Sequence, residues 1–407
     1  MQCGLLGGKL GHSYSPRIHG ELADYTYTLF EKAPEEVEGF LRSGPWDGLN
    51  VTLPYKKTVI PFCDTLSPLA REIGSVNTLV RRADGTIHGD NTDAFGFETL
   101  LRSVPGANAL SGGKALVLGS GGASVTVCAV LKKLGFTVVT ISRSGEDNYE
   151  NLSRHEDAVL LVNTTPLGMY PNNGTKAVDL QKLPALKAVL DVVYNPARTA
   201  LMLQAEELGI PTAGGLVMLV AQAMRSAEIF LGTSLPDTEI ARITALLSRS
   251  MQNLILIGMP GSGKTHVASL LAEKLSRECL EADAELEKAA GMTIPEIFAN
   301  EGEEGFRRRE TETLSALGKR SGIVLSTGGG CVTRKENYPL LHQNGVIFRL
   351  TRDVEKLPRD GRPLSLRSDL KQMAAQREPL YGQFADFTID NNATPEEAVS
   401  AILEVFA

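Results

Sequence analysis

The sequence lacks the features that mark membrane, secreted and nucleic-acid-binding proteins. No segment approaches the ~18 unbroken apolar residues that a membrane-spanning helix needs. The start of the chain, Met1–Gly7, has neither the basic cluster nor the cleavage site of a secretory signal. The formal net charge is −7, so the positive excess that favours a nucleic-acid partner is missing. We therefore expect a cytoplasmic protein that acts on small molecules, without a membrane or nucleic-acid partner.

Cysteine is also scarce. The five cysteines are Cys3, Cys63, Cys128, Cys279 and Cys331. They are scattered, and no pair has the spacing of a CxxC motif or of a metal site. We expect free thiols in a reducing compartment.

Length and composition place the chain among soluble globular proteins. Hydrophobic residues make up 43% and charged residues 22% of the sequence. At about 150 residues per domain, a chain of this length predicts two or three domains. No internal repeat or low-complexity tract is present, and nothing in the sequence indicates an oligomeric state.

One glycine-rich loop, Gly258–Thr265, fits the pattern G-x-x-x-x-G-K-[ST] at every position. It follows the apolar run Leu254–Ile257 and precedes His266–Leu275, whose apolar residues share one helical face. Strand, loop and helix therefore occur in the required order, and an ordinary glycine turn is the weaker interpretation. In such a loop the backbone N–H groups surround a phosphate, the lysine reaches the outer phosphates and the hydroxyl holds Mg²⁺. The predicted nucleotide-binding residues are Gly261, Ser262, Gly263, Lys264, Thr265 and His266, with Thr265 as the metal ligand.

A second glycine-rich loop, Gly119–Ser124, matches the dinucleotide pattern G-x-G-x-x-G less well, because Ser124 replaces the third glycine. Its surroundings support the assignment. Lys114–Leu118 and Phe136–Ile141 have the composition of buried strands, and a helical pattern lies between them. This is a βαβ unit, and it predicts cofactor contacts from Gly119, Ser120, Gly121, Gly122 and Ala123.

The end of the second strand indicates which dinucleotide binds. A loop for NAD places an acidic residue there for the ribose 2′-hydroxyl, whereas this chain has Ser142, Arg143 and Ser144. A cation at this point favours the 2′-phosphate of NADP. The alternative is an exposed arginine beside a turn.

The pattern of strands and helices divides the chain further. Residues 1–93 alternate short apolar runs such as Gly48–Leu53 with helical stretches and form a first lobe. Further strand candidates after the second loop, Ala158–Val162 and Val189–Val193, complete a nucleotide lobe over 94–213. Helical patterns from Leu216 to Phe230 and from Asp237 to about Arg249 would return to the first lobe, leaving only a short linker at Ser248–Asn253.

Short polar side chains gather in motifs of the first lobe. Ser13 and Ser15 would lie on one side of an extended chain, which suits a polyhydroxy acid. The alternative is a serine-rich turn that caps a helix beginning near Pro16. Asn50 and Thr52 likewise project together shortly before Lys56.

These motifs resemble those of shikimate dehydrogenases. Ser-x-Ser-Pro, Asn-Val-Thr-x-Pro-x-Lys, Val-Asn-Thr-Leu and Gly-Asp-Asn-Thr-Asp occur in that family's order, and the similarity extends from Met1 to about Arg249. The resemblance implies NADPH-dependent reduction of 3-dehydroshikimate to shikimate, with Lys56 and Asp93 as the catalytic pair. It further implies a cofactor contact from Gly215 and substrate contacts from Ser13, Ser15, Asn50, Thr52, Asn77, Tyr194 and Gln222.

The remainder of the chain, residues 254–407, resembles shikimate kinase. The motifs are Asp283–Lys288, Glu301–Arg307, Gly328–Gly330, Gly361–Leu364 and Arg377–Tyr381. By this resemblance, Asp283, Arg307, Gly329 and Arg377 bind shikimate, and the two arginines suit a bidentate grip on its carboxylate. ATP then phosphorylates shikimate, with Lys264, Asp283 and the lid residue Arg362 as catalytic groups.

Two positions depart from the kinase pattern. Glu281 stands where the family usually carries an aspartate, and its longer arm could disturb the contacts of Mg²⁺. Between Arg359 and Arg362 only two residues intervene, so the lid is shorter than expected.

The predicted fold is therefore α/β: a two-lobed dehydrogenase with a Rossmann-like NADP domain over 1–250, then a P-loop kinase domain with a parallel sheet over 251–407. Two alternatives stay open. One is an NAD-dependent dehydrogenase that oxidises quinate or shikimate. The other is that one half is a catalytically dead binding module.

Overall fold

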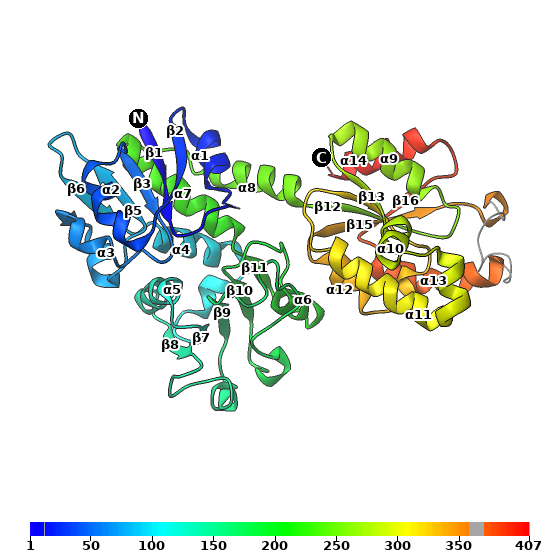
Figure 1. Cartoon of the computed structure of the whole chain (residues 1–407). Coiled ribbons are helices and arrows are strands. Elements are labelled where there is room, and N and C mark those ends of the chain that lie inside the picture. Colours follow the sequence, from blue (N-terminus) through cyan, green and yellow to red (C-terminus); the bar gives the residue numbers. More distant parts are fainter. Residues whose placement is uncertain (12, 358–369, 407) are drawn as a thin grey trace. The chain divides into compact units, whose positions relative to one another are not determined.

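The computed structural model describes residues 1–11, 13–357 and 370–406. They form two compact units, drawn in Figure 1. Unit 1 comprises Met1–Met169, Thr175–Asn195 and Leu201–Leu246, and unit 2 comprises Tyr170–Gly174, Pro196–Ala200 and Leu247–Ala407. The domain boundary that the sequence predicts at residue 250 stays a prediction.

The division between the two units falls inside helix α8 (Thr238–Met251). The sequence predicts that this helix ends near Arg249, but it continues almost to the next strand, leaving only Gln252 between them. The reason is that no glycine or proline interrupts the segment, and Leu247 and Met251, one helical turn apart, are both buried. The predicted linker at Ser248–Asn253 is therefore mostly helix.

The first sheet of unit 1 has the order β2-β1-β3-β5-β6-β4. Its strands are β1 (Gln2–Gly7), β2 (Thr26–Glu31), β3 (Gly48–Val51), β4 (Thr65–Leu66), β5 (Thr78–Arg81) and β6 (Ile87–Asp90), and helices α1 (Ser15–Leu22), α2 (Val37–Ser43) and α3 (Pro68–Ile73) belong to the same lobe. The first three strands are parallel, while β5 is antiparallel to β3 and β6. Strand β3 stops two residues earlier than predicted, and Leu53 beyond it is 69% exposed.

The second sheet of unit 1 is wholly parallel, with the order β11-β10-β9-β7-β8. Its strands are β7 (Lys114–Leu118), β8 (Thr137–Ile141), β9 (Leu160–Asn163), β10 (Ala188–Asp191) and β11 (Thr212–Gly214), and its neighbouring helices are α5 (Gly122–Lys133) and α6 (Ala200–Glu207). Alternate residues of β7 enter two separate apolar clusters: Ala115 and Val117 join one, Leu116 and Leu118 the other. Both faces of this sheet are therefore covered, as in a doubly wound fold.

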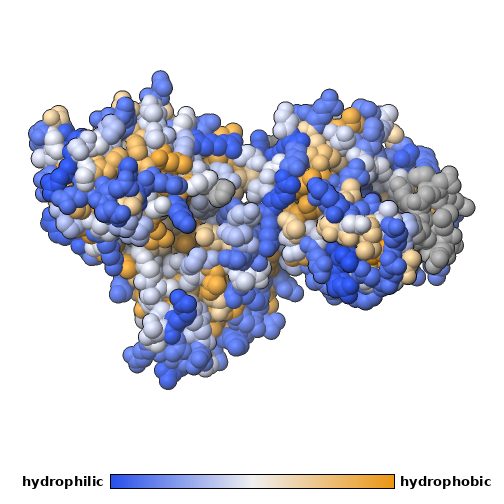
Figure 2. All heavy atoms as spheres, in the orientation of Figure 1, coloured by the Kyte–Doolittle hydropathy of each residue, from blue (hydrophilic) through white to orange (hydrophobic). Residues whose placement is uncertain are grey.

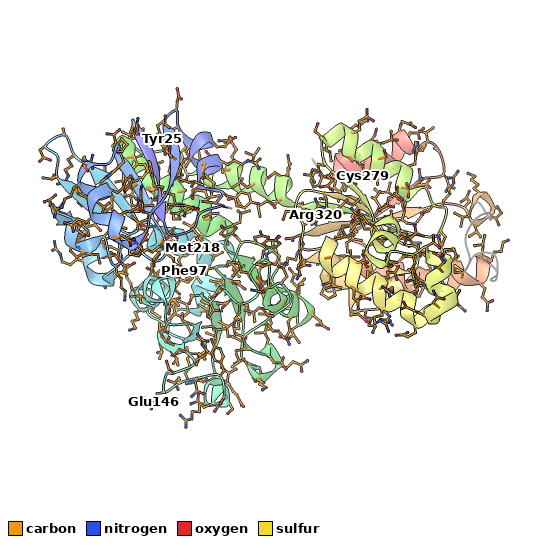
Figure 3. All side chains as sticks on the ribbon, in the orientation of Figure 1. Tyr25, Phe97, Glu146, Met218, Cys279 and Arg320 are labelled. Atoms are coloured by element: carbon orange, nitrogen blue, oxygen red, sulfur yellow. The ribbon has the colours of Figure 1, made fainter. Side chains whose placement is uncertain are left out.

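Two long helices connect the sheets of unit 1. They are α4 (Asp93–Ser103) and α7 (Leu216–Leu231), and they pack against each other along their length. Phe97 of α4 and Met218 of α7 meet in one apolar cluster and lie close together in Figure 3. Since α7 also contacts α1 and β5, it returns to the first lobe as predicted.

Unit 2 contains a third sheet, also parallel, with the order β13-β14-β12-β15-β16. Its strands are β12 (Asn253–Ile257), β13 (Cys279–Glu281), β14 (Val324–Ser326), β15 (Gly345–Thr351) and β16 (Phe387–Asp390). Its helices are α9 (Lys264–Leu275), α10 (Ala282–Ala290), α11 (Ile294–Leu317), α12 (Asn337–His342), α13 (Leu370–Phe384) and α14 (Pro395–Phe406). Every residue of β12 is buried, as the central strand of a covered sheet requires.

The surface is largely hydrophilic on the face that Figure 2 shows, with smaller apolar areas between charged and polar side chains. Within the described residues, no helix is both long enough and apolar enough to cross a membrane. All five cysteines are free thiols, which agrees with their scattered positions in the sequence.

Candidate functional site

A cavity of about 250 Å³ opens in unit 1. It brings together predicted site residues from the first lobe, from α4 and α7, and from the nucleotide lobe. Those that line it are Ser13, Ser15, Asn50, Thr52, Lys56, Asn77, Asp93, Ala123, Tyr194, Gly215 and Gln222. Residues that lie far apart in the chain therefore face one small volume.

The shortest polar contact in this cavity joins Lys56 and Asp93. Lys56 Nζ donates to Asp93 Oδ2 over 2.5 Å, and both side chains are largely buried. The other carboxylate oxygen, Oδ1, accepts from Asn77 Nδ2 at 2.9 Å. Asp93 begins α4 and is held on both oxygens, so it can fix the ammonium of Lys56 at one point of the cavity.

A network of hydrogen bonds fixes Asn77 in turn. Its Oδ1 accepts the backbone N–H of Thr92 at 2.7 Å and the hydroxyl of Thr78 at 3.0 Å. Its Nδ2 also donates to Thr92 Oγ1 at 3.0 Å. Asn77 thus orients the carboxylate of Asp93 as well as lining the cavity.

The segment with Ser13 and Ser15 differs from its predicted extended form. Tyr14 has helical backbone angles and caps α1, which begins at Ser15, and Ser13 Oγ accepts the backbone N–H of Ser15 at 3.2 Å. The turn forms because a serine hydroxyl competes for a free N–H at a helix start. Both serines nevertheless line the cavity.

The nucleotide lobe contributes Tyr194, Gly215 and the loop after β7. Burial raises the pKa of the Tyr194 phenol, so this group stays protonated and can donate. A Cβ at Gly215 would lie 2.0 Å from the carbonyl oxygen of Val192, so only glycine fits there. In the loop, Gly119 has a φ of +103°, and Gly121 is the cap of α5.

The remaining predicted cofactor residues lie outside this cavity. Gly119, Ser120 and Gly121 lie between β7 and α5, and Gly122 begins α5, where the N–H groups at the helix start favour a phosphate. Ser142, Arg143 and Ser144 directly follow β8, and Arg143 is exposed.

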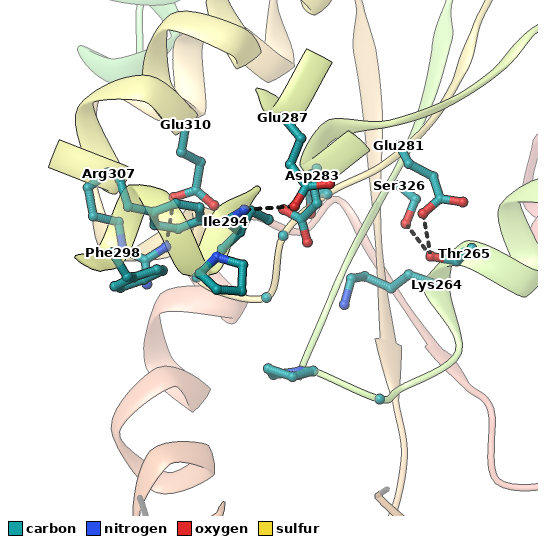
Figure 4. A pocket seen from close by; sticks show the side chains of 18 of the residues that line it. Lys264, Thr265, Glu281, Asp283, Glu287, Ile294, Phe298, Arg307, Glu310 and Ser326 are labelled. Carbon is teal, nitrogen blue, oxygen red and sulfur yellow. Dashed lines mark hydrogen bonds and ion pairs between the residues drawn. The ribbon is translucent and has the colours of Figure 1, made fainter. Parts of the chain in front are cut away.

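A second cavity, of about 370 Å³, opens in unit 2. It brings together the phosphate loop and the predicted substrate residues; those that line it are Gly261, Lys264, Thr265, Asp283, Arg307, Gly329 and Arg377. Figure 4 shows Lys264, Asp283 and Arg307 around the same space. Ser262, Gly263 and His266 are not part of this lining, and His266 is exposed.

The phosphate loop depends on glycines with positive φ. Gly258, Gly261 and Gly263 have φ values of +147°, +85° and +95°, and α9 begins directly after the last of them. Lys264 Nζ donates to the carbonyl oxygens of Gly258 and Met259 at 3.0 and 3.1 Å. The lysine is therefore held against the loop, close to the N–H groups at the helix start.

Oxygen atoms of three residues meet beside this loop. The hydroxyl of Thr265 donates to Glu281 Oε2 at 3.2 Å and lies 3.4 Å from Ser326 Oγ, as Figure 4 shows. Glu281 therefore reaches the hydroxyl of Thr265 with its longer arm. Hydroxyl and carboxylate oxygens are the ligands that Mg²⁺ takes in proteins, usually together with several waters. Within the described residues, no three His, Cys, Asp or Glu side chains cluster as a metal site.

Charged side chains that line this cavity away from the phosphate loop affect the pKa values of two carboxyl groups there. Although Asp283 is open to the cavity, the surrounding protein raises the pKa of its carboxyl, and Lys264 and Arg307 oppose that rise. Arg307 Nη1 donates to Glu310 Oε2 at 2.7 Å, and both side chains are buried. Burial raises the pKa of Glu310 as well. Arg377 and Tyr381 both donate to the carbonyl oxygen of Gly329, at 3.2 and 2.5 Å.

Sequence reasoning missed Glu310 and Tyr381. The position of Glu310, three residues after Arg307 in a helical pattern, is a signal that could have indicated a partner for the arginine. Tyr381 ends the motif that contains Arg377, but its bond to a glycine carbonyl depends on the tertiary structure. The predicted lid, with Arg359 and the catalytic candidate Arg362, lies outside the described residues.

Family models match both parts of the chain. A model described as shikimate dehydrogenase substrate binding domain matches residues 5–79, and a model described as shikimate kinase matches residues 260–407. These matches confirm the two resemblances seen in the sequence.

Curated and solved proteins match the first part. A shikimate dehydrogenase (NADP(+)) of Paramagnetospirillum magneticum is 38% identical over 255 residues, which cover 56% of this chain and 92% of that protein. A chorismate mutase/shikimate 5-dehydrogenase fusion protein of Clostridium acetobutylicum has a TM-score of 0.56 and 34% identity, covering 60% of this chain and 96% of that one. A quinate dehydrogenase of Corynebacterium glutamicum in complex with NAD has a TM-score of 0.54 and 26% identity, with 61% and 99% covered. The predicted α/β fold is thereby confirmed, while the fold is shared by enzymes with different substrates.

Proposed function

The chain belongs to the shikimate dehydrogenase family and carries a shikimate kinase domain, and we propose that it catalyses two consecutive reactions of aromatic amino-acid biosynthesis. The first is NADPH-dependent reduction of 3-dehydroshikimate to shikimate. The second is ATP-dependent phosphorylation of shikimate to shikimate 3-phosphate. Consumption of ATP in the second reaction would draw the reversible first reaction forward.

The contact between Lys56 and Asp93 is the observation that best supports the first reaction. Reduction of a ketone adds a hydride to the carbonyl carbon and a proton to the oxygen, and NADPH supplies the hydride when bound. The ammonium of Lys56 delivers the proton, and Asp93 holds that ammonium in place. Amides and hydroxyls around the pair, from Asn50, Thr52 and Gln222, would bind the polar groups of the substrate.

NADP is the proposed cofactor rather than NAD. The exposed Arg143 follows β8, at the position where a dinucleotide-binding fold contacts the ribose, and its positive charge suits a 2′-phosphate. The competing function, NAD-dependent oxidation of quinate or shikimate, is disfavoured by this arginine and by the kinase domain in the same chain. Cofactor preference distinguishes the two.

The second reaction is supported by one observation: the phosphate loop and the residues proposed to bind the acid line the same cavity. Arg307 and Arg377 would bind the carboxylate of shikimate, and Asp283 would orient or deprotonate the hydroxyl that attacks. Lys264 would neutralise charge on the outer phosphates, which ATP supplies when bound. Thr265 and Glu281 offer oxygen ligands for Mg²⁺, either directly or through water.

A coupled assay tests both reactions. The protein is supplied with 3-dehydroshikimate and NADPH, with shikimate and Mg²⁺-ATP, and with all substrates together. We expect NADPH oxidation in the first mixture, ADP release in the second, and shikimate 3-phosphate in the third. If ADP release fails although NADPH is oxidised, the kinase half is a dead binding module. We further propose a cytoplasmic location, consistent with five free thiols and with the use of NADPH and ATP.

A further inference from the structure

Tyr27 lies behind the cavity of unit 1 and contacts two residues that line it. Its hydroxyl, on strand β2, donates to Asn50 Oδ1 over 2.7 Å. Asn50 is only 4% exposed, and its exposed edge faces the cavity. The same hydroxyl also has a hydrogen bond with Ser15. Tyr27 is not among the described residues that line this cavity. It can therefore act on a bound ligand only through the lining residues that it contacts.

The neighbouring hydrogen bonds decide which way the amide of Asn50 points. The backbone N–H of Thr92 can only donate, so the atom of Asn77 that receives it is the oxygen. Thr78 Oγ1 donates to that same oxygen at 3.0 Å, which leaves its lone pairs facing Asn50 at 3.5 Å. The nitrogen of Asn50 accordingly lies nearest Thr78. Its oxygen faces Tyr27 at 2.7 Å and, more distantly, the hydroxyl of Ser226 at 3.4 Å.

The distance between Tyr27 and Asn50 agrees with this orientation. A separation of 2.7 Å is usual for an O–H···O bond and short for an N–H···O bond. Burial raises the pKa of the Tyr27 phenol well above its ordinary value, so the proton needed for this bond is always present. Tyr27 is consequently the donor, and Asn50 Oδ1 is the acceptor.

The ring of Tyr27 is held in place by stacking. His19 of α1 lies parallel to it, with ring centroids 4.0 Å apart and an interplanar angle of 10°. His19 Nδ1 is itself bonded to the hydroxyl of Tyr25 at 2.6 Å, and Tyr25 is labelled in Figure 3. Burial lowers the pKa of His19 to about 3, so the stack stays uncharged at neutral pH.

We propose that Tyr27 is a positioning residue of the dehydrogenase, which holds the amide oxygen of Asn50 away from the cavity and so turns an N–H of Asn50 toward it. The substrate group bound at this point is then a hydrogen-bond acceptor: a carbonyl, hydroxyl or carboxylate oxygen. This inference rests on the proposed reduction of 3-dehydroshikimate.

The first test compares Tyr27→Phe with Tyr25→Phe in the full-length protein. Both remove one part-buried phenol hydroxyl, from Tyr27 on β2 and from Tyr25 just before that strand, but only the first hydroxyl bonds to Asn50. We expect Tyr27→Phe to raise the KM for 3-dehydroshikimate about five- to tenfold, with kcat and the KM for NADPH nearly unchanged. Tyr25→Phe should leave all three constants near those of the unchanged protein.

A double-mutant cycle shows whether Tyr27 acts through Asn50. In an Asn50→Ala background, Tyr27→Phe should change the KM less than twofold, because the contact it supports is already gone. A fold defect would instead persist in that background. Equal effects in both backgrounds would overturn the proposal.

Asn50→Asp supplies a test that leaves Tyr27 and the stack intact, should Tyr27→Phe fold poorly. One carboxylate oxygen keeps the bond from Tyr27, and the other replaces the N–H at the cavity. We expect the KM to exceed that of Asn50→Ala, since an acceptor and a charge now face the substrate's acceptor. A KM near that of the unchanged protein would mean that the oxygen of Asn50 already faces the cavity, and the proposal would be wrong. If the unchanged protein does not reduce 3-dehydroshikimate at all, it is the proposed function that fails.

Discussion

At Asp283, opposing effects set the charge of the group proposed to face the attacking hydroxyl. Loss of water raises the pKa of the carboxyl, and Glu281 and Glu287 add to the rise, whereas Lys264 and Arg307 oppose it. The net shift is upward, so this carboxylate is a stronger base than an aspartate in free solution. A raised pKa of this kind suits a group that accepts a proton or a hydrogen bond from the substrate.

The kinase reaction should therefore lose activity in acid earlier than an ordinary carboxylate would predict. Asp283 acts when deprotonated. The value of kcat/KM for shikimate should therefore be low at a pH below the raised pKa of Asp283 and should increase as the pH rises through that pKa. We expect the acidic limb of the pH–activity profile to have its midpoint above the ordinary aspartate pKa of about 3.8. Asp283→Asn should lower kcat by at least about a hundredfold and remove that limb. A limb that persists in Asp283→Asn would assign it to another group, with Glu310 the first candidate because burial raises its pKa too.

A second prediction at the residue scale concerns Arg143. If its guanidinium binds the 2′-phosphate, Arg143→Ala removes a charge-assisted hydrogen bond worth a factor of about ten or more in affinity. The KM for NADPH should rise by that factor, while the KM for NADH changes little. Lys187→Ala, which removes an exposed lysine just before β10, serves as the matched control for charge. Equal KM increases for both cofactors would contradict the assignment.

At the scale of elements, close backbone approaches decide how the helices and loops of each cavity meet. Gly215 is the cap of α7, and it allows this helix to begin directly against the backbone after β10. Helix α7 carries Gln222 and packs on α4, which begins with Asp93. The start of α7 therefore influences how far Gln222 and the other residues of the first lobe lie from the residues that the nucleotide lobe contributes to the cavity of unit 1.

Gly215→Ala adds only a methyl group, but it should lower both the stability and the activity of the dehydrogenase. Its Cβ would meet the carbonyl oxygen of Val192 at 2.0 Å, and backbone atoms cannot move aside as a flexible side chain can. We expect a stability loss of about 1–3 kcal/mol and a clear fall in NADPH oxidation, measured by denaturant unfolding and by activity. Gly39→Ala in α2 is the control: no atom lies within 4 Å of the added Cβ, so it should stabilise by about 0.5–1 kcal/mol. A neutral Gly215→Ala would show that α7 can shift freely.

At the scale of the whole molecule, each of the two candidate sites draws its described lining residues from a single compact unit. The residues around Lys56 all belong to unit 1, and those around Lys264 all belong to unit 2. Among the described residues, neither cavity takes a lining residue from the other unit. The two reactions should therefore be separable by single substitutions.

Lys56→Ala should abolish NADPH oxidation and leave ADP release from shikimate and ATP within about twofold. Lys264→Ala should do the reverse. Both are measured on the same full-length preparations, and a mixture of the two variants should restore conversion of 3-dehydroshikimate to shikimate 3-phosphate, since shikimate diffuses between them. Loss of both activities in either variant would indicate coupling between the units, and loss of neither would refute the catalytic assignments.

The sequence by itself determined both families, the α/β architecture and most of the residues that line the cavity of unit 1, together with the charged and glycine residues of the cavity of unit 2. It could do so because these features depend on local patterns: glycines where a loop needs positive φ, apolar runs for buried strands, and polar motifs at strand ends. Helix ends were predicted less well, as α8 shows, because burial of Leu247 and Met251 extends the helix past its predicted end.

Only the tertiary structure decided the partners that fix these residues in place. Ser13 and Ser15 form a turn rather than an extended segment, Glu310 pairs with Arg307, and Tyr27 stands behind Asn50. No spacing in the chain could place Tyr27 next to Asn50, since they lie on strands β2 and β3 with β1 between them. The orientation of an amide depends on donors and acceptors that converge from several elements, and these meet only when the chain has folded.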